Sequence, residues 1–219
     1  AVMNSLLKHG RVIRGWLGVA IQPVTKDLMR AMNLTSTRGV LISDVMQDSP
    51  AARGGIKRGD VILSLAGELI RDPAHLRNRI AASGSGAKVR MTIVRRGKKR
   101  QMSIRLGELD GSQTRTKKER PATAKSGHLA GLTVENIDAR RRQQYNIPKS
   151  IKAGVVVTMV EPSSASERAG VQVGDVLVEV NQKSVRSIAA FKQRYRKSDK
   201  RTLLLIQRGQ RTLYIVLNK

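Results

Sequence analysis

The segment RGWLGV, residues 14–19, has residue types that can bind an anion through the backbone. A turn flanked by glycines that enters a strand can direct successive N–H groups into one concavity, which holds a carboxylate without a charged side chain. Gly18 has no Cβ and therefore allows close approach. If the following strand lies at a sheet edge, its unpaired backbone can also accept an extended peptide as an added strand. The alternative is an ordinary turn with core residues.

Few other residues suggest chemistry. Cysteine is absent and the three histidines are far apart, which excludes disulfides, thiolate zinc sites, cysteine nucleophiles and a histidine-rich metal centre. Ser85 lies between two glycines in a polar loop, but no His or Asp is placed to form a catalytic triad with it. Asp60 and Asp175 each follow a glycine and are interpreted as turn-forming residues. We therefore expect no cofactor, no metal site and no catalysis by this chain.

The chain of 219 residues is strongly basic, with 42 Lys and Arg, 16 Asp and Glu, and a formal net charge of +26. This charge is spread: residues 1–110 carry +12, residues 111–126 carry +4 and residues 127–219 carry +10. Only 2% of the residues are aromatic, whereas RNA-binding modules usually add stacking aromatics. We expect no specific nucleic-acid partner. No apolar run reaches the roughly 18 residues of a membrane span, and the first ten residues lack the features of a signal peptide.

An internal repeat divides the chain into two copies of one module. GVLISDVMQDSPAARGGIKRGDVIL, starting at Gly39, matches GVVVTMVEPSSASERAGVQVGDVLV, starting at Gly154, at an offset of 115 residues. Further on, VRRG ending at Gly97 matches IQRG ending at Gly209. The repeat predicts two domains, residues 11–109 and 128–219, joined by an exposed basic linker over residues 110–127.

Local patterns predict short strands and helices in each copy. SPAARGG begins with a capping serine, has proline at the first helical position and ends in glycines, which is typical of a short helix. In DPAHLRNRIAAS, Asp72 is the expected cap, and Leu76 and Ile80 fall on one helix face. We expect strands over residues 16–21, 39–45, 61–66, 88–94 and 101–106, and helices over residues 25–33, 49–55, 72–83 and 138–146.

The order of these motifs resembles a bacterial-type PDZ domain, and residues 11–219 resemble the tandem PDZ region of the HtrA/DegP/DegQ (protease Do) family. RGWLGV is similar to the carboxylate-binding loop of the family's first PDZ domain, and SPAARGGIKRGDVILSLAGELI to its most recognisable stretch. Residues 1–10 resemble the closing helix of the family's protease domain. The resemblance implies a mixed α+β chain of two PDZ domains, each a small, partly open β-barrel or sandwich of five to six strands with two or three helices.

The resemblance also implies site residues in the first domain. The backbone N–H groups of Leu17, Gly18 and Val19 would hold the carboxylate at a peptide's C-terminus, and Arg14 would assist. The strand from Val19 to Ile21 would pair with the peptide. Besides Leu17 and Val19, the residues implied for pairing and for the apolar pocket are Ala20, Ile21, Leu76, Ile80, Trp16 and His75.

The second copy departs from the family's pattern. Its counterparts of the loop, strand and pocket are Gly131, Leu132, Thr133 and Phe191. WLGV becomes AGLT there, and no arginine precedes it. Whether this copy binds peptide is left open by the sequence, and the family resemblance implies assembly contacts as another role.

The implied function is a peptide-binding regulatory and substrate-recognition region of an HtrA-type serine protease and chaperone. It would capture C-termini or extended segments of misfolded proteins. The implied partners are these unfolded segments, the protease domain of a parent serine endopeptidase, and other PDZ domains in an oligomer. The implied location is the bacterial periplasm, with membrane association. The alternatives are a basic module that binds an anionic polymer or membrane surface, and a module that serves mainly in assembly.

Overall fold

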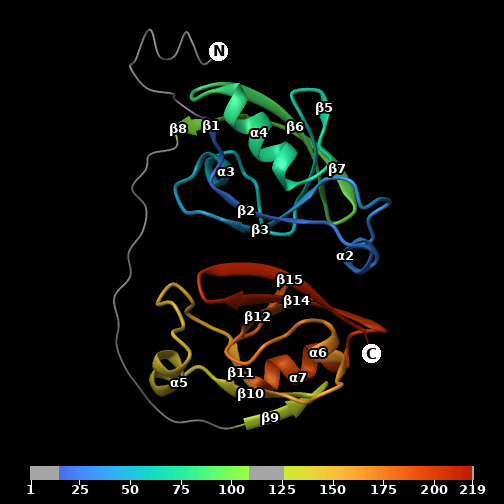
Figure 1. The fold of residues 1–219 in the computed structure, drawn as a ribbon, viewed down its shortest axis with the longest axis vertical. Coiled ribbons are helices and arrows are strands. Elements are labelled where there is room, and N and C mark those ends of the chain that lie inside the picture. Colours follow the sequence, from blue (N-terminus) through green and yellow to red (C-terminus); the bar gives the residue numbers. More distant parts are fainter. Residues whose placement is uncertain (1–14, 109–125, 219) are drawn as a thin grey trace. The chain divides into compact units, whose positions relative to one another are not determined.

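A computed structural model describes residues 15–108 and 126–218. The chain divides into two compact units, residues 1–113 and 114–219, which are called domain 1 and domain 2 below (Figure 1). The segment 1–10, Arg14 and most of the expected linker lie outside the described residues.

Within residues 15–108, domain 1 is an open antiparallel sheet with three helices (Figure 1). The sheet order is β2-β3-β4-β6-β7, with β5 paired to β4, and the short strands β1 and β8 pair with each other. The elements are β1 (Gly15–Trp16), β2 (Val19–Pro23), α2 (Lys26–Ala31), β3 (Val40–Val45), α3 (Pro50–Arg53), β4 (Val61–Leu65), β5 (Glu68–Leu69), α4 (Pro73–Ser83), β6 (Lys88–Arg95), β7 (Lys98–Arg105) and β8 (Gly107–Glu108).

The main sheet of domain 2 repeats the strand order of the main sheet of domain 1, with one additional described strand, β9, at its edge. Its sheet order is β15-β14-β12-β11-β10-β9, with β13 paired to β12. The elements are β9 (Ser126–Leu129), β10 (Leu132–Asn136), α5 (Ala139–Gln144), β11 (Val155–Val160), α6 (Ala165–Arg168), β12 (Val176–Val180), β13 (Lys183–Ser184), α7 (Ile188–Arg196), β14 (Arg201–Arg208) and β15 (Arg211–Asn218).

The helices begin where the sequence predicts. The Ser49 hydroxyl accepts the Ala52 N–H at 3.1 Å and caps α3, with Pro50 in the first turn. Asp72 accepts the His75 N–H at 2.8 Å and caps α4, again with a proline following. Each cap satisfies an N–H that has no partner within the helix, so both helices have a defined first residue.

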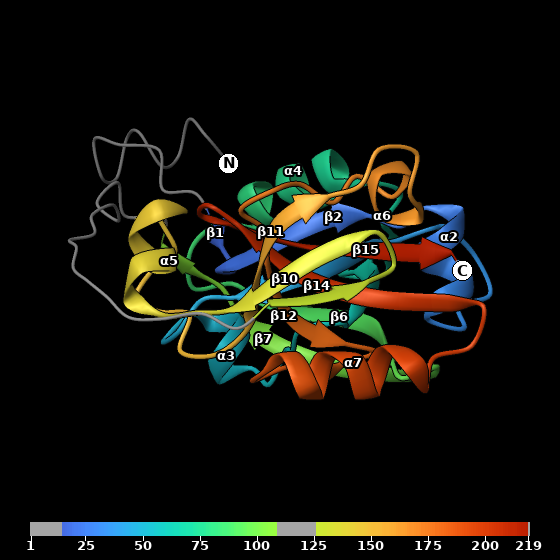
Figure 2. The same cartoon turned by 90° about the horizontal axis from the view of Figure 1, so that it is seen from below.

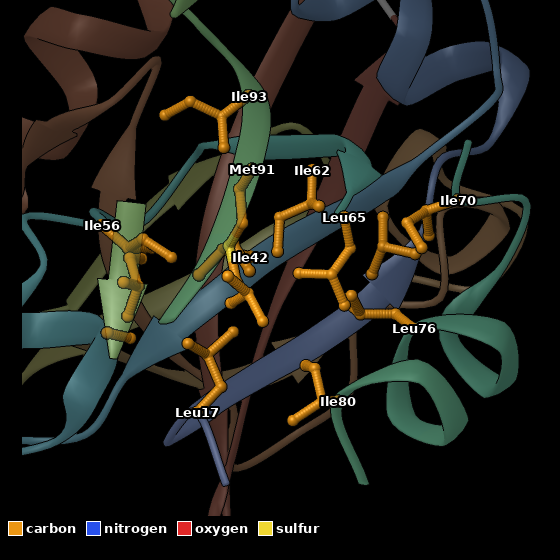
Figure 3. Close-up of a cluster of buried hydrophobic side chains, with 14 of the residues drawn as sticks. Leu17, Ile42, Ile56, Ile62, Leu65, Ile70, Leu76, Ile80, Met91 and Ile93 are labelled. Atoms are coloured by element: carbon orange, nitrogen blue, oxygen red, sulfur yellow. The ribbon is translucent and has the colours of Figure 1, made fainter. Parts of the chain in front are cut away.

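The core of domain 1 lies between the sheet and α4 (Figure 3). Leu76 and Ile80 project from α4 toward Leu17, Ile42 and the neighbouring strands (Figure 3). Their spacing of four residues places both on one helix face, as the sequence predicts, so their burial holds α4 beside the start of β2.

The expectation of a mixed α+β fold is confirmed, and the sheets are open rather than closed into barrels. The expected boundary of the linker is wrong at its C-terminal end, because Ser126 and Gly127 belong to β9. The polar composition of residues 110–127 hides this strand, since its pairing depends on backbone hydrogen bonds rather than on apolar side chains.

Candidate peptide-binding site

Strand β2 forms an edge of the domain 1 sheet. Its one strand neighbour within the described residues is β3, which it meets through pairs such as Val19 with Val45 and Ile21 with Ile42. The residues from Val19 to Gln22 are half-buried. The side of β2 that faces away from β3 is called the open edge below, because its backbone pairs with no described strand.

The loop before β2 has its carbonyl groups bound inward. The Leu17 carbonyl accepts the Ala51 N–H at 2.9 Å, and the Gly18 carbonyl accepts the Met46 N–H at 3.0 Å. Within the described residues, the N–H groups of Leu17 and Gly18 donate to no other group. This arrangement leaves two adjacent donors at the start of the open edge, which is the geometry that backbone anion sites use.

Gly18 is required by both conformation and space. Its φ is +78°, in the region that glycine adopts without strain, and an added Cβ would lie 2.3 Å from the Cβ of Ser49. Trp16 packs beside it, because a ring carbon of the indole lies 3.0 Å from that added Cβ. Trp16 also pairs with Gly107 across β1 and β8, and another ring carbon of the indole would lie 3.3 Å from a Cβ added to Gly107.

The apolar residues expected in the pocket come together at the rim of the core. Leu17, Leu76 and Ile80 are buried in the same cluster, against which Val19 and Ile21 are partly buried (Figure 3). The C-terminal end of α4 lies beside β1, directly before the loop, since a Cβ on Gly15 would lie 2.3 Å from the Ile80 carbonyl oxygen. Ile80 therefore flanks the loop, whereas Leu76 lies deeper in the core with no exposed surface.

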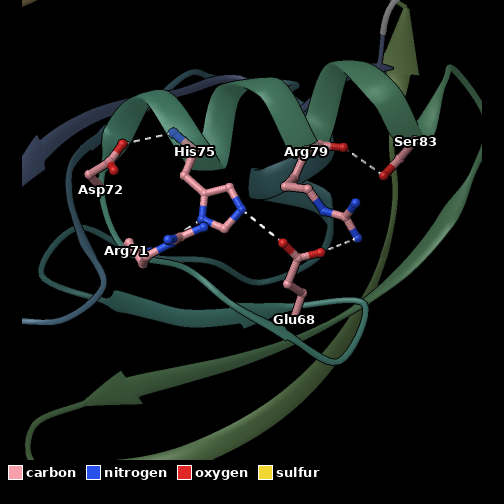
Figure 4. Close-up of polar contacts among 6 residues, drawn as sticks. All are labelled: Glu68, Arg71, Asp72, His75, Arg79 and Ser83. Atoms are coloured by element: carbon pink, nitrogen blue, oxygen red, sulfur yellow. Dashed lines mark hydrogen bonds and ion pairs between the residues drawn. The ribbon is translucent and has the colours of Figure 1, made fainter.

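His75 is held by a polar network on α4 (Figure 4). Its Nδ1 accepts the Arg71 N–H at 3.4 Å, and its Nε2 lies 3.0 Å from the Glu68 carboxylate, which also binds Arg79 at 2.7 Å. Because Nδ1 accepts, Nε2 carries the proton and donates to Glu68. The His75 backbone N–H also lowers the pKa of Asp72, because it donates to that carboxylate. The ring thus links β5 to the helix.

A cavity of about 740 Å³ in domain 1 is not lined by the loop. Its lining comes from the segment after α2, from β4 and β5, and from the β6–β7 hairpin. Of the expected site residues, His75 is the one that lines it. The backbone features at residues 17–21 therefore define the candidate site better than cavity volume does, since strand addition uses a sheet edge.

Strand β10 is the structural counterpart of β2. It follows Gly131, which has φ +73° and would place a Cβ 2.3 Å from the Cβ of Ser164. The Gly131 carbonyl accepts the Glu161 N–H at 2.8 Å, as the Gly18 carbonyl accepts that of Met46. The pairing of each strand with its inner neighbour also shifts register after the second residue of the strand. Gly131, Leu132 and Thr133 therefore occupy the positions of Gly18, Val19 and Ala20.

In domain 2, β9 occupies the edge that is open in domain 1 (Figures 1 and 2). β9 pairs antiparallel with β10 from Leu129 with Leu132 to Ser126 with Glu135. The turn between them is Ala130 and Gly131, both with positive φ, at +59° and +73°, which is typical of a two-residue type I′ hairpin. As a result Leu132 and Thr133 are buried, at 1% and 7% exposure. Phe191, at 0%, belongs to the core of domain 2.

The helices beside the two edges are attached differently. The Ile188 N–H at the start of α7 donates to the Asn136 side chain at the end of β10, at 3.1 Å. The corresponding residue of α4 is Pro73, which has no N–H. Lys183 and Ala190 replace Glu68 and His75, so the polar network of Figure 4 belongs to domain 1.

Sequence reasoning missed a duplicated ion pair. Buried Asp60 accepts two hydrogen bonds from Arg95, at 2.7 and 2.6 Å, and buried Asp175 accepts two from Arg208, both at 2.7 Å. The carboxylate holds each guanidinium in its charged form and raises the pKa of both arginines. These aspartates therefore do more than form turns. The pairs also correct the alignment of the hairpins, since Arg95 corresponds to Arg208 and Gly97 is not the counterpart of Gly209.

The sheet, the capped helices and the glycine loop together define two PDZ domains. Residues 15–106 and residues 156–208 match the PDZ domain family. The chain therefore belongs to the PDZ domain family through both of its units. PDZ domains are non-catalytic modules that bind extended peptides at a sheet edge.

The curated relatives are named probable periplasmic serine endoprotease DegP-like. One from Brucella suis is 31% identical over 99% of this chain and 41% of its own length. One from Rhizobium meliloti is 36% identical over 85% of this chain and 36% of its length. The chain thus spans about two fifths of the length of these relatives.

The solved structures that are similar to this chain include HtrA proteases. The HtrA-type protease AlgW with decapeptide is 36% identical with a TM-score of 0.46, over 51% of this chain and 34% of its own. A serine endoprotease from Yersinia pestis is 28% identical with a TM-score of 0.40, over 50% of this chain and 34% of its own. In the described ranges, no helix of this chain is long and apolar enough to cross a membrane.

Proposed function

We propose that domain 1 binds the C-termini or extended segments of unfolded proteins at the open edge of β2. The observation that carries this proposal is the coincidence of two features. Among the described residues, the backbone of β2 has no strand partner on one side, and the loop that precedes it holds its carbonyls inward while its N–H groups have no described acceptor. A peptide could therefore add as a strand while its terminal carboxylate meets the N–H groups of Leu17, Gly18 and Val19.

Domain 2 indicates which backbone groups would pair with the ligand. There, the closing pair of the hairpin is Leu129 with Leu132, and such a pair exchanges both hydrogen bonds. Val19 and Ile21 are the counterparts of Leu132 and Val134, so their N–H and C=O groups face the ligand. An apolar terminal side chain would lie against Leu17, Val19 and Ile80. Backbone pairing with one such contact gives a dissociation constant on the order of micromolar.

In the cell, this binding would select substrates for a serine endopeptidase of which the chain forms part, in the bacterial periplasm. The support is the relatives, which carry the periplasmic serine endoprotease name and extend well beyond the length of this chain. The protease domain of the parent chain and the PDZ domains of neighbouring subunits would then be partners. Binding of a peptide would change protease activity through the difference in affinity between two states of the parent.

Calorimetric titration tests this proposal. An eight-residue peptide that ends in valine is titrated into the chain as a free acid and as an amide, each at low and high salt. We expect amidation to weaken binding at least tenfold and high salt to change the affinity of the free acid only modestly. Equal affinity of acid and amide would contradict carboxylate recognition. Binding that disappears at high salt for both peptides would instead support the polyanion alternative, because exposed charges are then screened.

A further inference from the structure

We infer that residues 126–129 are an intramolecular ligand of domain 2, with Leu129 in the position that a peptide's terminal residue would occupy. The edge of β10 is then a peptide-binding edge that the chain itself has filled. This inference rests on the pairing within domain 2 and does not depend on binding by domain 1.

The direction of β9 is that of a ligand added at a PDZ edge. It runs antiparallel to β10 and ends at the turn of Ala130 and Gly131, which occupies the position of the Leu17–Gly18 loop. Leu129 is therefore placed where a terminal side chain would lie. The peptide bond that follows Leu129 takes the place of the ligand's carboxylate.

The contacts of Leu129 support this assignment. Leu129 and Ala130 pack against the core cluster of domain 2, which includes Phe191 and Tyr195 of α7. Phe191 and Tyr195 occupy the helix positions of Leu76 and Ile80 in domain 1. The Ala130 carbonyl also accepts the Ser166 hydroxyl at 2.6 Å, which fixes the turn to α6.

A tethered strand should resist competition. Its effective concentration beside β10 is set by a two-residue turn and is on the order of millimolar or higher for so short a connection. A free peptide of micromolar affinity would have to displace it and would lose at least about tenfold in apparent affinity. Domain 2 is therefore closed to C-termini that domain 1 accepts, unless the segment before Ala130 is drawn away.

Amide hydrogen exchange of the full chain tests the inference without any variant. In the hairpin, the N–H groups of Leu132 and Val134 donate to β9, whereas those of Val19 and Ile21 have no such acceptor in the part of the chain that the structure describes. We expect the two domain 2 amides to exchange at least tenfold more slowly than their domain 1 counterparts. Equal exchange at the two edges would overturn the inference, because β9 would then not protect β10.

A matched pair of proline variants adds a second test. Gly127 is in a hydrogen-bonded pair with Val134, whereas His128 is in a non-hydrogen-bonded pair with Thr133, so only Gly127→Pro removes a donor to β10. We expect Gly127→Pro to speed exchange at Val134 at least tenfold, His128→Pro to leave it within about threefold, and β14 and β15 to stay protected in both. The same effect of both prolines, or of neither, would contradict the hydrogen-bonding pattern.

The segment supplied as a free peptide completes the test. The probe is ATAKSGHL, residues 122–129 with a free carboxylate. We expect it to shift amide resonances of β10 in the Gly127→Pro chain at concentrations at least tenfold below those needed with the unaltered chain. Equal shifts of β10 in both chains would mean that the edge is open, and the inference would fail.

Discussion

Strands β2 and β10 follow equivalent glycines, but their outer edges have different neighbours. Gly18 and Gly131 share positive φ, the same close approach to a capping serine and the same inward carbonyl bond. β2 then presents a half-buried edge with no further described strand, whereas β10 is covered by β9 and buried. The difference shows that the loop alone does not define a binding site, since the segment before it decides whether the edge is available.

The helices beside the two edges are also held by different polar contacts. α7 is bound to the end of β10 through Asn136 and Ile188. α4 begins with Pro73, which has no N–H for such a bond, and is instead braced on another side through Glu68. Among the described polar contacts, those that hold α4 therefore do not involve the strand that would receive a ligand, whereas in domain 2 one of them joins α7 to that strand.

The largest expected effect on stability concerns the buried ion pair between an aspartate and an arginine that both domains contain. Replacing Arg95 or Arg208 with methionine should leave Asp60 or Asp175 buried without its partner, and should cost about 3–5 kcal/mol of unfolding free energy in the affected domain. Chemical denaturation of the two variants measures this cost. Arg96→Met, in the neighbouring turn, serves as the control and should change stability little. A loss in one domain only would show that the ion pairs are not equivalent.

Substitution of the glycine before β2 and of the glycine before β10 distinguishes an effect on stability from an effect on peptide binding. Gly18→Ala and Gly131→Ala should each cost about 1–3 kcal/mol, because alanine at positive φ is strained and its Cβ would meet a serine Cβ. Only Gly18→Ala should weaken peptide binding, by more than tenfold, as measured by calorimetry. If Gly131→Ala weakened binding equally, domain 2 would be contributing a site of its own.

The apolar contact beside the loop has a smaller expected effect. Ile80→Ala should reduce the affinity for a peptide that ends in valine by about five- to tenfold, because it removes apolar surface that the terminal side chain would cover. Asn78→Ala, on the exposed face of α4, is the matched control. Fluorescence polarisation with a labelled peptide distinguishes the two. Unchanged affinity for Ile80→Ala would place the terminal side chain elsewhere.

The smallest effect is expected for the network around His75. Glu68→Gln weakens its ion pair with Arg79, but Glu68 is 44% exposed, so the variant should lose less than about 1 kcal/mol of stability. Thermal unfolding measures that loss, and peptide affinity should fall less than threefold. A large drop in affinity would mean that Glu68 or His75 contacts the ligand directly.

Sequence patterns predicted the helices better than they predicted the ion pairs and the edge strand β9. Caps such as Ser49 and Asp72 and the helical spacing of Leu76 and Ile80 carry their information locally, so the helices were found. The pairing of Asp60 with Arg95 joins residues 35 positions apart and leaves no local pattern. Strand β9 was not predicted because its residues are polar and it pairs through backbone groups at a sheet edge. The two-residue turn at Ala130 and Gly131 was a signal that could have indicated a hairpin.

Among the described strands, the edge of β2 has no neighbour, whereas the edge of β10 is already filled by β9. The most direct measurement follows the amide resonances of the full chain during titration with one peptide that ends in valine with a free carboxylate. We predict shifts in residues 17–21 and in α4, with none in β10 or α7 at the concentration that saturates domain 1. Shifts of equal size along β10, or no shifts along β2, would contradict the account.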